Sequence, residues 1–410
     1  MKGENQMAKQ IVIVGALDTK GQEFKFVKDL IEKEGLATLV VDFGVLGQPG
    51  FEPDISREDV AKKGGHEISE FADGKHKDEA MKTMAMGLEE IVIQLYEDGK
   101  LDGIIGMGGS GGTSITTTAM RALPVGVPKV MVSTMGGGDV SPFAGTKDIT
   151  FMPSIVDVSG INSISSNIYA NAAGAIAGMV KTEKPDTGEE KPLITASMFG
   201  NTTTAVDHAR GILESEGYEV LVFHATGTGG KTMEGLITDG YITACLDITT
   251  TELADEVCGG ILSAGPDRLK AAAHEGIPAI IVPGCVDMAN FGGVETVPDK
   301  YKDRNLYEWN PNVTLLRTNV EENKKIGKMI AQAANESKAP VVILLPLQGV
   351  SMLDSEGERF WDPEADAACY DAIKANVKSD IKIIESDHNI NDPEFSGLCA
   401  KTLLNLLNKK

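Results

Sequence analysis

Cysteine, aromatic side chains and positive charge are all scarce in this chain of 410 residues. The five cysteines are scattered and odd in number, and neither HxxxH nor CxxC spacing occurs, so we expect no disulfide framework and no metal site. Against 60 Asp and Glu there are 38 Lys and Arg, a formal charge of −22. Because nucleic acid must be met by basic side chains, this balance argues against a nucleic-acid partner.

Long apolar runs are also missing. No stretch approaches the roughly 18 apolar residues that a membrane span needs, and the polar start MKGENQMAKQ contains no charged-then-apolar leader. We therefore expect a cytoplasmic protein with no membrane partner. A hydrophobic share of 42% is ordinary for globular proteins, and the length is sufficient for two domains.

What is present is a regular alternation of short apolar runs and amphipathic stretches. IVIVGA and LVVDFG alternate with segments such as EFKFVKDLIEKEG, and the pattern continues through IIGMGG, KVMVST and ITFMPS. It resumes later with LITASMFGNTT, EVLVFHATGTGG, AIIVPG, VTLLRT, VVILLP and IKIIES. Strand, glycine loop, helix and strand in this order are typical of parallel sheets covered on both faces. The pattern predicts the α/β class, with two doubly wound (Rossmann-like) parallel-sheet domains in tandem.

The alternation breaks at KTEKPDTGEEKP, residues 181–192, which is charged, bracketed by prolines and aperiodic. We predict a first domain over 1–183, a linker over 184–192 and a second domain over 193–410. The two halves resemble each other, because LIEKEGLATLVVDFG (30–44) lies over ILESEGYEVLVFHAT (212–226) with matching Glu-Gly turns. Either a duplication or the strand–helix–strand pattern that such domains have in common explains this match.

Two glycine loops follow strands of the first domain, where open α/β sheets hold their ligands. Glycine amides at the start of a helix form an anion cradle, since no Cβ keeps a phosphate away. Tight turns between packed elements are the alternative, and Asp139 is equally suited to a magnesium contact or a turn. GALDTKG lacks the glycines of the dinucleotide fingerprint, which disfavours a nicotinamide cofactor. The predicted cofactor-binding residues are Asp18, Thr19, Lys20, Gly108, Gly109, Ser110, Gly111, Gly112, Thr113, Gly136, Gly137, Gly138 and Asp139.

The second domain has its own glycine loop, ATGTGGKT at 225–232, which nearly matches a phosphate loop. Its candidate phosphate contacts are Gly227, Gly229 and Gly230. Glu234 and Asp287 are candidate acid–base residues, and Arg317 is a candidate clamp for a carboxylate or phosphate. The alternatives are helix capping for the acids and pairing with Glu321 or Glu322 for the arginine. Cys285 is expected to be an inert thiol, since no histidine can be paired with it from sequence.

Several long motifs point to a known family. GMGGSGGTSI, VSTMGGGDVSPFAG, LDITTTELAD, VPGCVDMANFG, NPNVTLLRTN and HNINDPEF occur in order along nearly the whole chain. Together they resemble an uncharacterised two-domain family of bacteria, fungi and plants, which includes the tomato mosaic virus resistance protein that inhibits viral RNA replication. The resemblance implies an ATP-binding first domain, a distinct second α/β domain and self-association. It does not transfer the antiviral activity to this chain.

The residues and the resemblance together favour ATP, with or without Mg²⁺, as the ligand of the first domain. Two functions stay open. One is an enzyme acting on a small carboxylate or phosphorylated metabolite in an interdomain cleft, and the other is a non-catalytic nucleotide-binding regulatory or interaction protein. Small residues at Ala170, Ala173, Gly174, Ala177 and Gly178 permit close helix packing, either inside one domain or between subunits. With the resemblance, they lead us to expect a homodimer or larger assembly.

Overall fold

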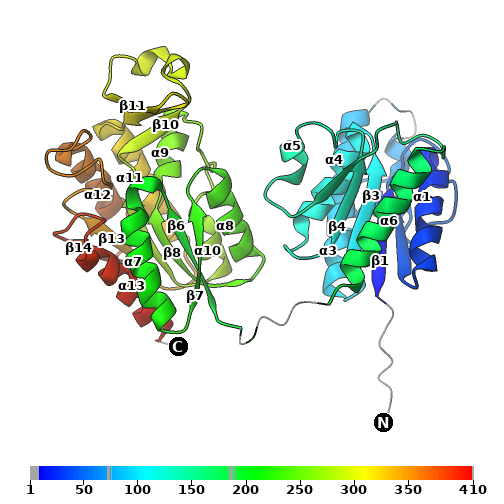
Figure 1. Cartoon of the computed structure of the whole chain (residues 1–410), viewed down its shortest axis with the longest axis horizontal. Helices are drawn as coiled ribbons and strands as arrows, with labels where there is room; N and C mark the ends of the chain where they lie inside the picture. Colours follow the sequence, from blue (N-terminus) through cyan, green and yellow to red (C-terminus); the bar gives the residue numbers. More distant parts are fainter. Residues whose placement is uncertain (1–8, 72–73, 75, 184–187, 189, 409–410) are drawn as a thin grey trace, which may run out of the picture. The chain divides into compact units, whose positions relative to one another are not determined.

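The computed structural model describes residues 9–71, 74, 76–183, 188 and 190–408 (Figure 1). The chain divides into two compact units, Met1–Asp186 and Thr187–Lys410, and this division falls within the predicted linker. Each unit is an α/β domain, so the predicted fold class is confirmed. None of the described helices combines the length and the apolar character needed to cross a membrane.

The first domain is built on a five-stranded parallel sheet with the order β2-β1-β3-β4-β5. Its central strands are buried on both faces, which explains why they appear in the sequence as continuous apolar runs. The strand order reverses between β1 and β3, and sheets of this kind bind ligands outside the carboxyl ends of the strands at such a reversal. The strands are β1 (Gln10–Gly15), β2 (Ala37–Asp42), β3 (Gly103–Gly108), β4 (Lys129–Ser133) and β5 (Thr150–Pro153).

Helices cover both faces of this sheet (Figure 1). On one face α1 and α6 pack around Phe24 and Tyr169, and on the other α2, α3 and α4 pack around Met84 and Met120. The helices are α1 (Leu17–Lys33), α2 (Arg57–Lys63), α3 (Lys77–Glu97), α4 (Ser110–Ala122), α5 (Ser141–Ala144) and α6 (Ser165–Lys181), with a 3₁₀ turn at Ile68–Phe71. This is the doubly wound arrangement that the sequence predicts.

The second domain repeats this architecture on a six-stranded parallel sheet, β14-β13-β9-β8-β6-β7. Counted along the chain, its first five parallel strands have the same spatial order as those of the first domain. The strands are β6 (Leu193–Met198), β7 (Glu219–His224), β8 (Ile242–Thr249), β9 (Ala279–Gly284), β13 (Val341–Pro346) and β14 (Lys382–Ser386).

The sequence match between the two halves has a counterpart in their backbones. Gly35 and Gly217, at the matched Glu-Gly turns, have φ angles of 80° and 90°. Only glycine adopts this conformation readily, and it lets the chain leave one helix and enter the next strand directly. The same turn therefore connects α1 to β2 and the corresponding helix to β7.

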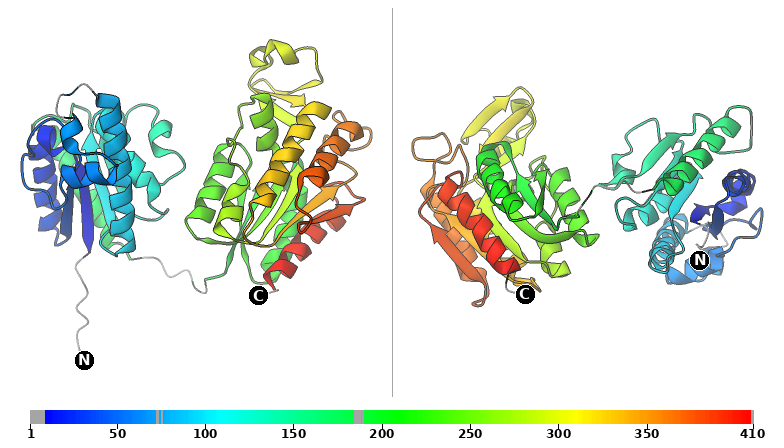
Figure 2. Two further views of the ribbon diagram at one scale, coloured as in Figure 1. Left: turned by 180° about the vertical axis from the view of Figure 1, so that it is seen from behind. Right: turned by 60° about the horizontal axis from the view of Figure 1, so that its bottom comes forward.

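Helices also cover both faces of the second sheet. One face carries α7 (Thr203–Ser215) and α13 (Pro393–Leu407). The other carries α8 (Thr228–Thr238), α9 (Thr251–Cys258), α10 (Lys270–Glu275), α11 (Val320–Asn335) and α12 (Pro363–Asn376), of which α11 and α12 lie side by side (Figure 2). A capping box starts α11, since Asn319 Oδ1 accepts the Glu322 N–H at 2.9 Å and Glu322 Oε2 accepts the Asn319 N–H at 2.8 Å.

A small antiparallel sheet, β10-β12-β11, interrupts the second domain between β9 and α11. Its strands are β10 (Met288–Phe291), β11 (Leu306–Asn310) and β12 (Val313–Arg317). The expectation that VTLLRT continues the main parallel sheet is therefore wrong. Since VTLLR is the buried central strand of this insert, it has the same apolar pattern as a buried parallel strand. The insert projects from one end of the domain (Figures 1 and 2).

Candidate functional site

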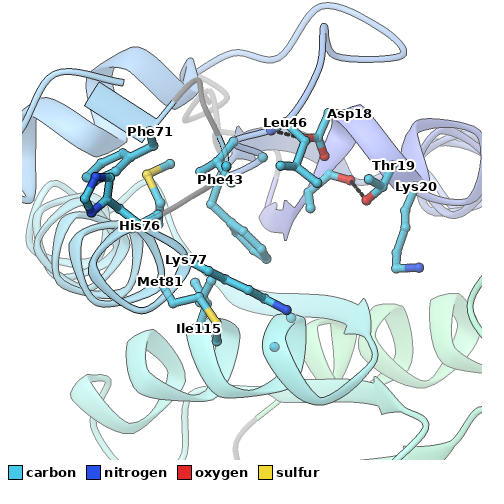
Figure 3. Close-up of a pocket in the computed structure, with 18 of the residues that line it drawn as sticks. Asp18, Thr19, Lys20, Phe43, Leu46, Phe71, His76, Lys77, Met81 and Ile115 are labelled. Carbon is cyan, nitrogen blue, oxygen red and sulfur yellow. Dashed lines mark hydrogen bonds between the residues drawn. The ribbon is translucent and has the colours of Figure 1, made fainter. Parts of the chain in front are cut away.

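A cavity of about 390 Å³ lies at the carboxyl ends of β1 and β3 in the first domain, where the strand order reverses (Figure 3). Its walls come from the residues after β1, the loop after β2, the residues around the start of α3, and the first turns of α4. Most of this wall is apolar, and it is formed by Phe43, Leu46, Phe71, Met81, Met84, Met107 and Ile115.

The first turn of α4 supplies free backbone amides to this cavity. Gly109 is the N-cap and has no side chain to accept a hydrogen bond. Within the described part of the chain, the N–H groups of Ser110, Gly111 and Gly112 have no acceptor. Gly111 and Gly112 line the cavity, while Gly108 packs directly against Gly112. Because a helix start also carries partial positive charge, this turn is suited to bind an anion.

Two lysines add positive charge to the cavity (Figure 3). Lys77 is the first residue of α3, and among the described residues its ammonium group has no hydrogen-bond or ion-pair partner. Lys20 donates a hydrogen bond to the Val158 carbonyl, and the adjacent Thr19 hydroxyl contacts the Ala16 carbonyl at 3.5 Å. Lys77 is thus the cation that is free to meet a ligand.

Two carboxylates hold the loop after β2 against the cavity. Asp18 Oδ2 accepts the Leu46 N–H at 2.7 Å, and Asp42 Oδ1 accepts the Gly44 N–H at 2.9 Å. A Cβ at Gly44 would lie 2.6 Å from the carboxyl carbon of Asp18, so this close approach requires glycine. Burial raises the pKa of Asp42 above its usual value. Asp18 lines the cavity, and its contacts position the loop that carries Phe43.

The second glycine loop of this domain lies outside the cavity wall. Gly136, Gly137 and Gly138 lead into the exposed Asp139, and none of these four residues lines the cavity. Asp139 Oδ1 accepts hydrogen bonds from the N–H and the hydroxyl of Ser141 at 2.9 and 2.6 Å, and these bonds lower its pKa. These bonds belong to a local turn, and none of them involves a residue that lines the cavity. Thr113 is also turned away, since its hydroxyl bonds the Ser133 hydroxyl at 2.7 Å.

The glycine loop of the second domain already holds an anion that belongs to the protein. Glu252 Oε1 accepts the N–H groups of Gly227 at 2.7 Å and Gly230 at 3.0 Å. Gly229 makes the turn possible, since a Cβ there would lie 1.8 Å from the His224 carbonyl oxygen. A phosphate at these amides would have to displace a fully buried carboxylate.

That carboxylate belongs to a buried charge cluster around Arg268. The guanidinium forms a bidentate pair with Asp247, at 2.5 and 2.7 Å, and its Nε donates to Glu252 at 2.5 Å. Glu234 lies within α8, rather than at a strand end as expected, and accepts a hydrogen bond from the Leu269 N–H. Burial raises the pKa of Glu234 to about 7, against the lowering effect of Arg268.

Arg317 is also enclosed by protein groups. Its Nε donates to the Phe360 carbonyl at 2.6 Å, its Nη1 to the hydroxyl of the next residue at 3.2 Å, and its Nη2 to Asp366 at 2.8 Å. Glu322, the alternative partner, pairs instead with Arg304 at 2.7 Å. A substrate clamp would require Arg317 to break these bonds first.

Asp287 lies close to this arginine, between β9 and β10. Its Oδ2 accepts the Ser351 hydroxyl at 2.8 Å, and its Oδ1 is buried without a partner among the described residues. Burial and the charge of Asp354 raise its pKa. Burial also holds the pKa of the Cys285 thiol well above its usual value, which agrees with an inert cysteine.

Sequence alone did not reveal the apolar half of the first cavity. Phe71, Met81 and Met84 come from the region around α3, and Phe43 and Leu46 from the loop after β2. In the sequence, KDEAMKTMAMGLEE has the periodicity of any core helix, and no local motif marks its methionines as cavity residues.

Comparisons with known proteins cover nearly the whole chain. The N-terminal and C-terminal domains of a family described as "Uncharacterised protein family (UPF0261)" match residues 9–185 and 191–407. A UPF0261 protein of Clostridium tetani is 52% identical over 404 residues, which is 98% of this chain and 100% of that one. A UPF0261 protein of Mesorhizobium japonicum is 42% identical over 399 residues, which is 96% of this chain and 98% of that one.

A plant protein and a solved structure extend these similarities. The ToMV resistance protein Tm-1(GCR237) of Solanum lycopersicum is 35% identical over 423 residues, which is 97% of this chain but 56% of the plant protein. Among solved structures, Est1E from Butyrivibrio proteoclasticus aligns with 55% of this chain and 91% of its own, at a TM-score of 0.31 and 16% identity. A likeness this distant says nothing about activity.

Proposed function

The chain belongs to the UPF0261 family, and from the cavity of its first domain we propose that it binds ATP or a closely related nucleoside phosphate. One observation carries this proposal. A single cavity combines an apolar wall, the free amides of Gly111 and Gly112, and the unpaired ammonium of Lys77. An inorganic anion would need only the amides and the lysine, and an apolar ligand would need only the wall. A nucleotide uses both.

The arrangement of the cavity suggests how such a ligand lies. Phosphate oxygens would accept hydrogen bonds from the first turn of α4 and charge from Lys77. The base would pack against Phe43, Phe71 and Met81, since aromatic rings and thioether sulfur both pack well on a flat ring. The cavity volume of about 390 Å³ falls within the range of about 300–1,000 Å³ that is usual for small-molecule sites.

The proposal concerns binding rather than turnover. An enzyme acting on a small carboxylate, with Arg317 as its clamp, has weaker support because the three guanidinium nitrogens are bonded within the protein. Glu234 is likewise bonded to Leu269 and lies beside Arg268. A non-catalytic nucleotide-binding role requires neither residue.

Thermal unfolding with three ligands tests the proposal. At 100 times its Kd, ATP should stabilise the protein by about 2.7 kcal/mol. Adenosine and inorganic tripolyphosphate, each filling part of the cavity, should stabilise it less at equal concentration. Each ligand is measured with and without Mg²⁺, and a phosphate-release assay on the ATP complex reports turnover. If tripolyphosphate equals ATP, the apolar wall takes no part, and if ATP produces no shift the proposal fails.

We also propose that the chain self-associates through α6. Ala173 and Ala177 are buried inside the first domain, whereas Ala170, Gly174 and Gly178 form an exposed stripe beside this buried face of the helix. A Cβ at either glycine would meet nothing within 4 Å, so a partner helix could approach closely. Light scattering should therefore give a mass above that of one chain, and leucine at Gly174 should lower it. A leucine at Gly211, an exposed glycine on α7, is the matched control.

A further inference from the structure

Strand β7 leaves one edge of the second domain's main sheet without a neighbouring strand. It is the last strand in the order β14-β13-β9-β8-β6-β7, and no strand of the described residues pairs with its outer side. Its sequence, EVLVFH, has an uninterrupted apolar centre without proline, and its pairing with β6 contains no bulge. Leu221, Val222 and Phe223 are partly exposed. A regular apolar edge of this kind is a template for pairing with another strand.

The other three edges of the two parallel sheets are protected, each in a different way. The segment before α2 runs along β2, where the Ile55 N–H donates to the Val40 carbonyl at 3.0 Å. Strand β5 has only four residues and ends in Pro153. Strand β14 carries the charged Lys382 and Glu385 at its exposed positions. Covered edges, short strands, prolines and charges all prevent edge pairing, and the centre of β7 has none of these protections.

The pairing of β7 with β6 shows which backbone groups face outward. The N–H groups of Glu219 and Ala225 donate to carbonyls at the two ends of β6, at 3.0 and 2.7 Å. Since alternate residues of a parallel strand bond to the same neighbour, the odd-numbered residues of β7 face β6. Val220 and Val222 therefore direct their N–H and C=O groups outward. None of these groups has a partner among the described residues.

We propose that this edge pairs, in the antiparallel direction, with the same edge of a second copy of the chain. About a two-fold axis, Val220 of each copy would lie opposite Val222 of the other, and their mutual hydrogen bonds would use every outward group of these residues. Leu221 would lie on the axis, opposite Leu221 of the second copy. The edge is thus complementary to itself, and a second copy satisfies its free groups completely.

Light scattering on the full chain tests this inference, separately from nucleotide binding. The Gly174→Leu chain lacks the proposed contact through α6, so it should have the mass of two chains if β7 pairs. Adding Val222→Pro removes an outward N–H and leaves the bonds of the odd-numbered residues to β6 intact, and proline is tolerated at such edge positions. This double variant should keep its fold, as measured by circular dichroism, and have the mass of one chain.

The matched control is Ile383→Pro on β14, in the same Gly174→Leu chain. The Leu347 N–H donates to the Ser386 carbonyl at 2.9 Å, so the even-numbered residues of β14 face β13 and the N–H of Ile383 faces outward. Like Val222, Ile383 is a partly exposed apolar residue on an edge strand. This control should keep the mass of two chains.

Disulfide cross-linking tests the register, and it decides if Val222→Pro does not fold. The native cysteines are all buried, so an introduced cysteine is the accessible thiol. Directly opposite residues of an antiparallel pair have Cβ atoms about 4.5–5.5 Å apart, close to the range that a disulfide needs. Leu221→Cys should therefore give a covalent dimer on mild oxidation. Glu219→Cys is more exposed but lies away from the axis, so it should not.

Three results would overturn the inference. The first is a Gly174→Leu chain with the mass of one chain. The second is a folded Val222→Pro variant that keeps the mass of two chains, or a control at Ile383 that loses it equally. The third is cross-linking of Glu219→Cys as readily as Leu221→Cys, because random collisions rather than a fixed register would then join the chains.

Discussion

A substitution at Gly111 should change ATP affinity without lowering the stability of the protein. A Cβ at this position would meet the Met81 methyl at 3.5 Å, an ordinary contact, so alanine fits without strain. Alanine is favoured over glycine in helices by up to about 1 kcal/mol. The added methyl would nevertheless occupy the cavity beside the proposed phosphate position. We expect Gly111→Ala to keep or raise the unfolding temperature while weakening ATP binding at least tenfold by calorimetry.

A control for this prediction comes from the second domain, outside the proposed α6 contact. Gly211→Ala, on the exposed side of α7, offers the same helix-propensity gain at a position that a Cβ can occupy freely. It should raise stability without changing ATP affinity. Gly137→Val, in the exposed turn after β4, should also leave ATP binding intact. Undiminished ATP binding in Gly111→Ala would place the phosphates elsewhere.

Glu234 predicts a specific pH dependence of stability. Its pKa is raised by burial from 4.5 to about 7, so the folded protein holds a proton that the unfolded chain releases in this range. The stability contributed by this carboxyl is complete below about pH 4.5 and is lost as the pH rises to about 7. Glu234→Gln removes the titration. The difference in unfolding free energy between the two proteins, measured with urea, should change by up to about 1.4 kcal/mol per pH unit between these limits. If the unfolding free energies of both proteins change with pH in the same way, the prediction is contradicted.

At the scale of elements, Arg268 ties α8, β8 and α9 to the segment before α10. Its guanidinium is fully buried among Asp247, Glu252 and Glu234. Arg268→Met would leave these carboxylates without a counter-charge, so it should lower the unfolding free energy by about 3–5 kcal/mol. The control is Arg210→Met, which breaks an exposed pair with Glu214 on α7 and should cost less than about 1 kcal/mol. If both variants lose a similar amount of unfolding free energy, burial does not determine the contribution of the Arg268 ion pairs to stability.

The elements of the main sheets are predictable from sequence because buried parallel strands require uninterrupted apolar runs, and IVIVGA, KVMVST and VVILLP contain them. The antiparallel insert cannot be distinguished from sequence, because its strand VTLLR is as buried and apolar as a strand of the main sheets. The loop that carries Gly111 and Gly112 can be recognised from sequence, because its glycines lie close together in the chain. The opposite wall of the cavity depends on where α3 packs, which no local pattern specifies. Equally, nothing near Gly227 indicates that Glu252 bonds its amide.

At the scale of the whole molecule, the division into domains can be tested with proteases chosen from the sequence. Residues 184–192 offer Glu189 and Glu190 to a glutamate-specific protease, and Glu183 lies just before them. Lys184 and Lys191 both precede proline, and trypsin cleaves such bonds poorly. Limited digestion with endoproteinase Glu-C should therefore yield two stable fragments, whereas trypsin should release them more slowly. Early cleavage inside α4 or α8 would contradict this boundary.

Because the carboxylate of Glu252 occupies one glycine loop and not the other, the two loops differ in how easily a dissolved anion can bind to their amides. Since it belongs to the chain, it competes for the amides of Gly227 and Gly230 at an effective concentration set by the fold, which for well-oriented groups far exceeds that of any dissolved metabolite. A dissolved nucleotide would therefore not displace this carboxylate from the amides. The amides of Gly111 and Gly112 have no such competitor among the described residues. With the proposed ligand, occupancy of the first loop would therefore follow the nucleotide concentration in solution, whereas the second loop keeps its own carboxylate at any concentration.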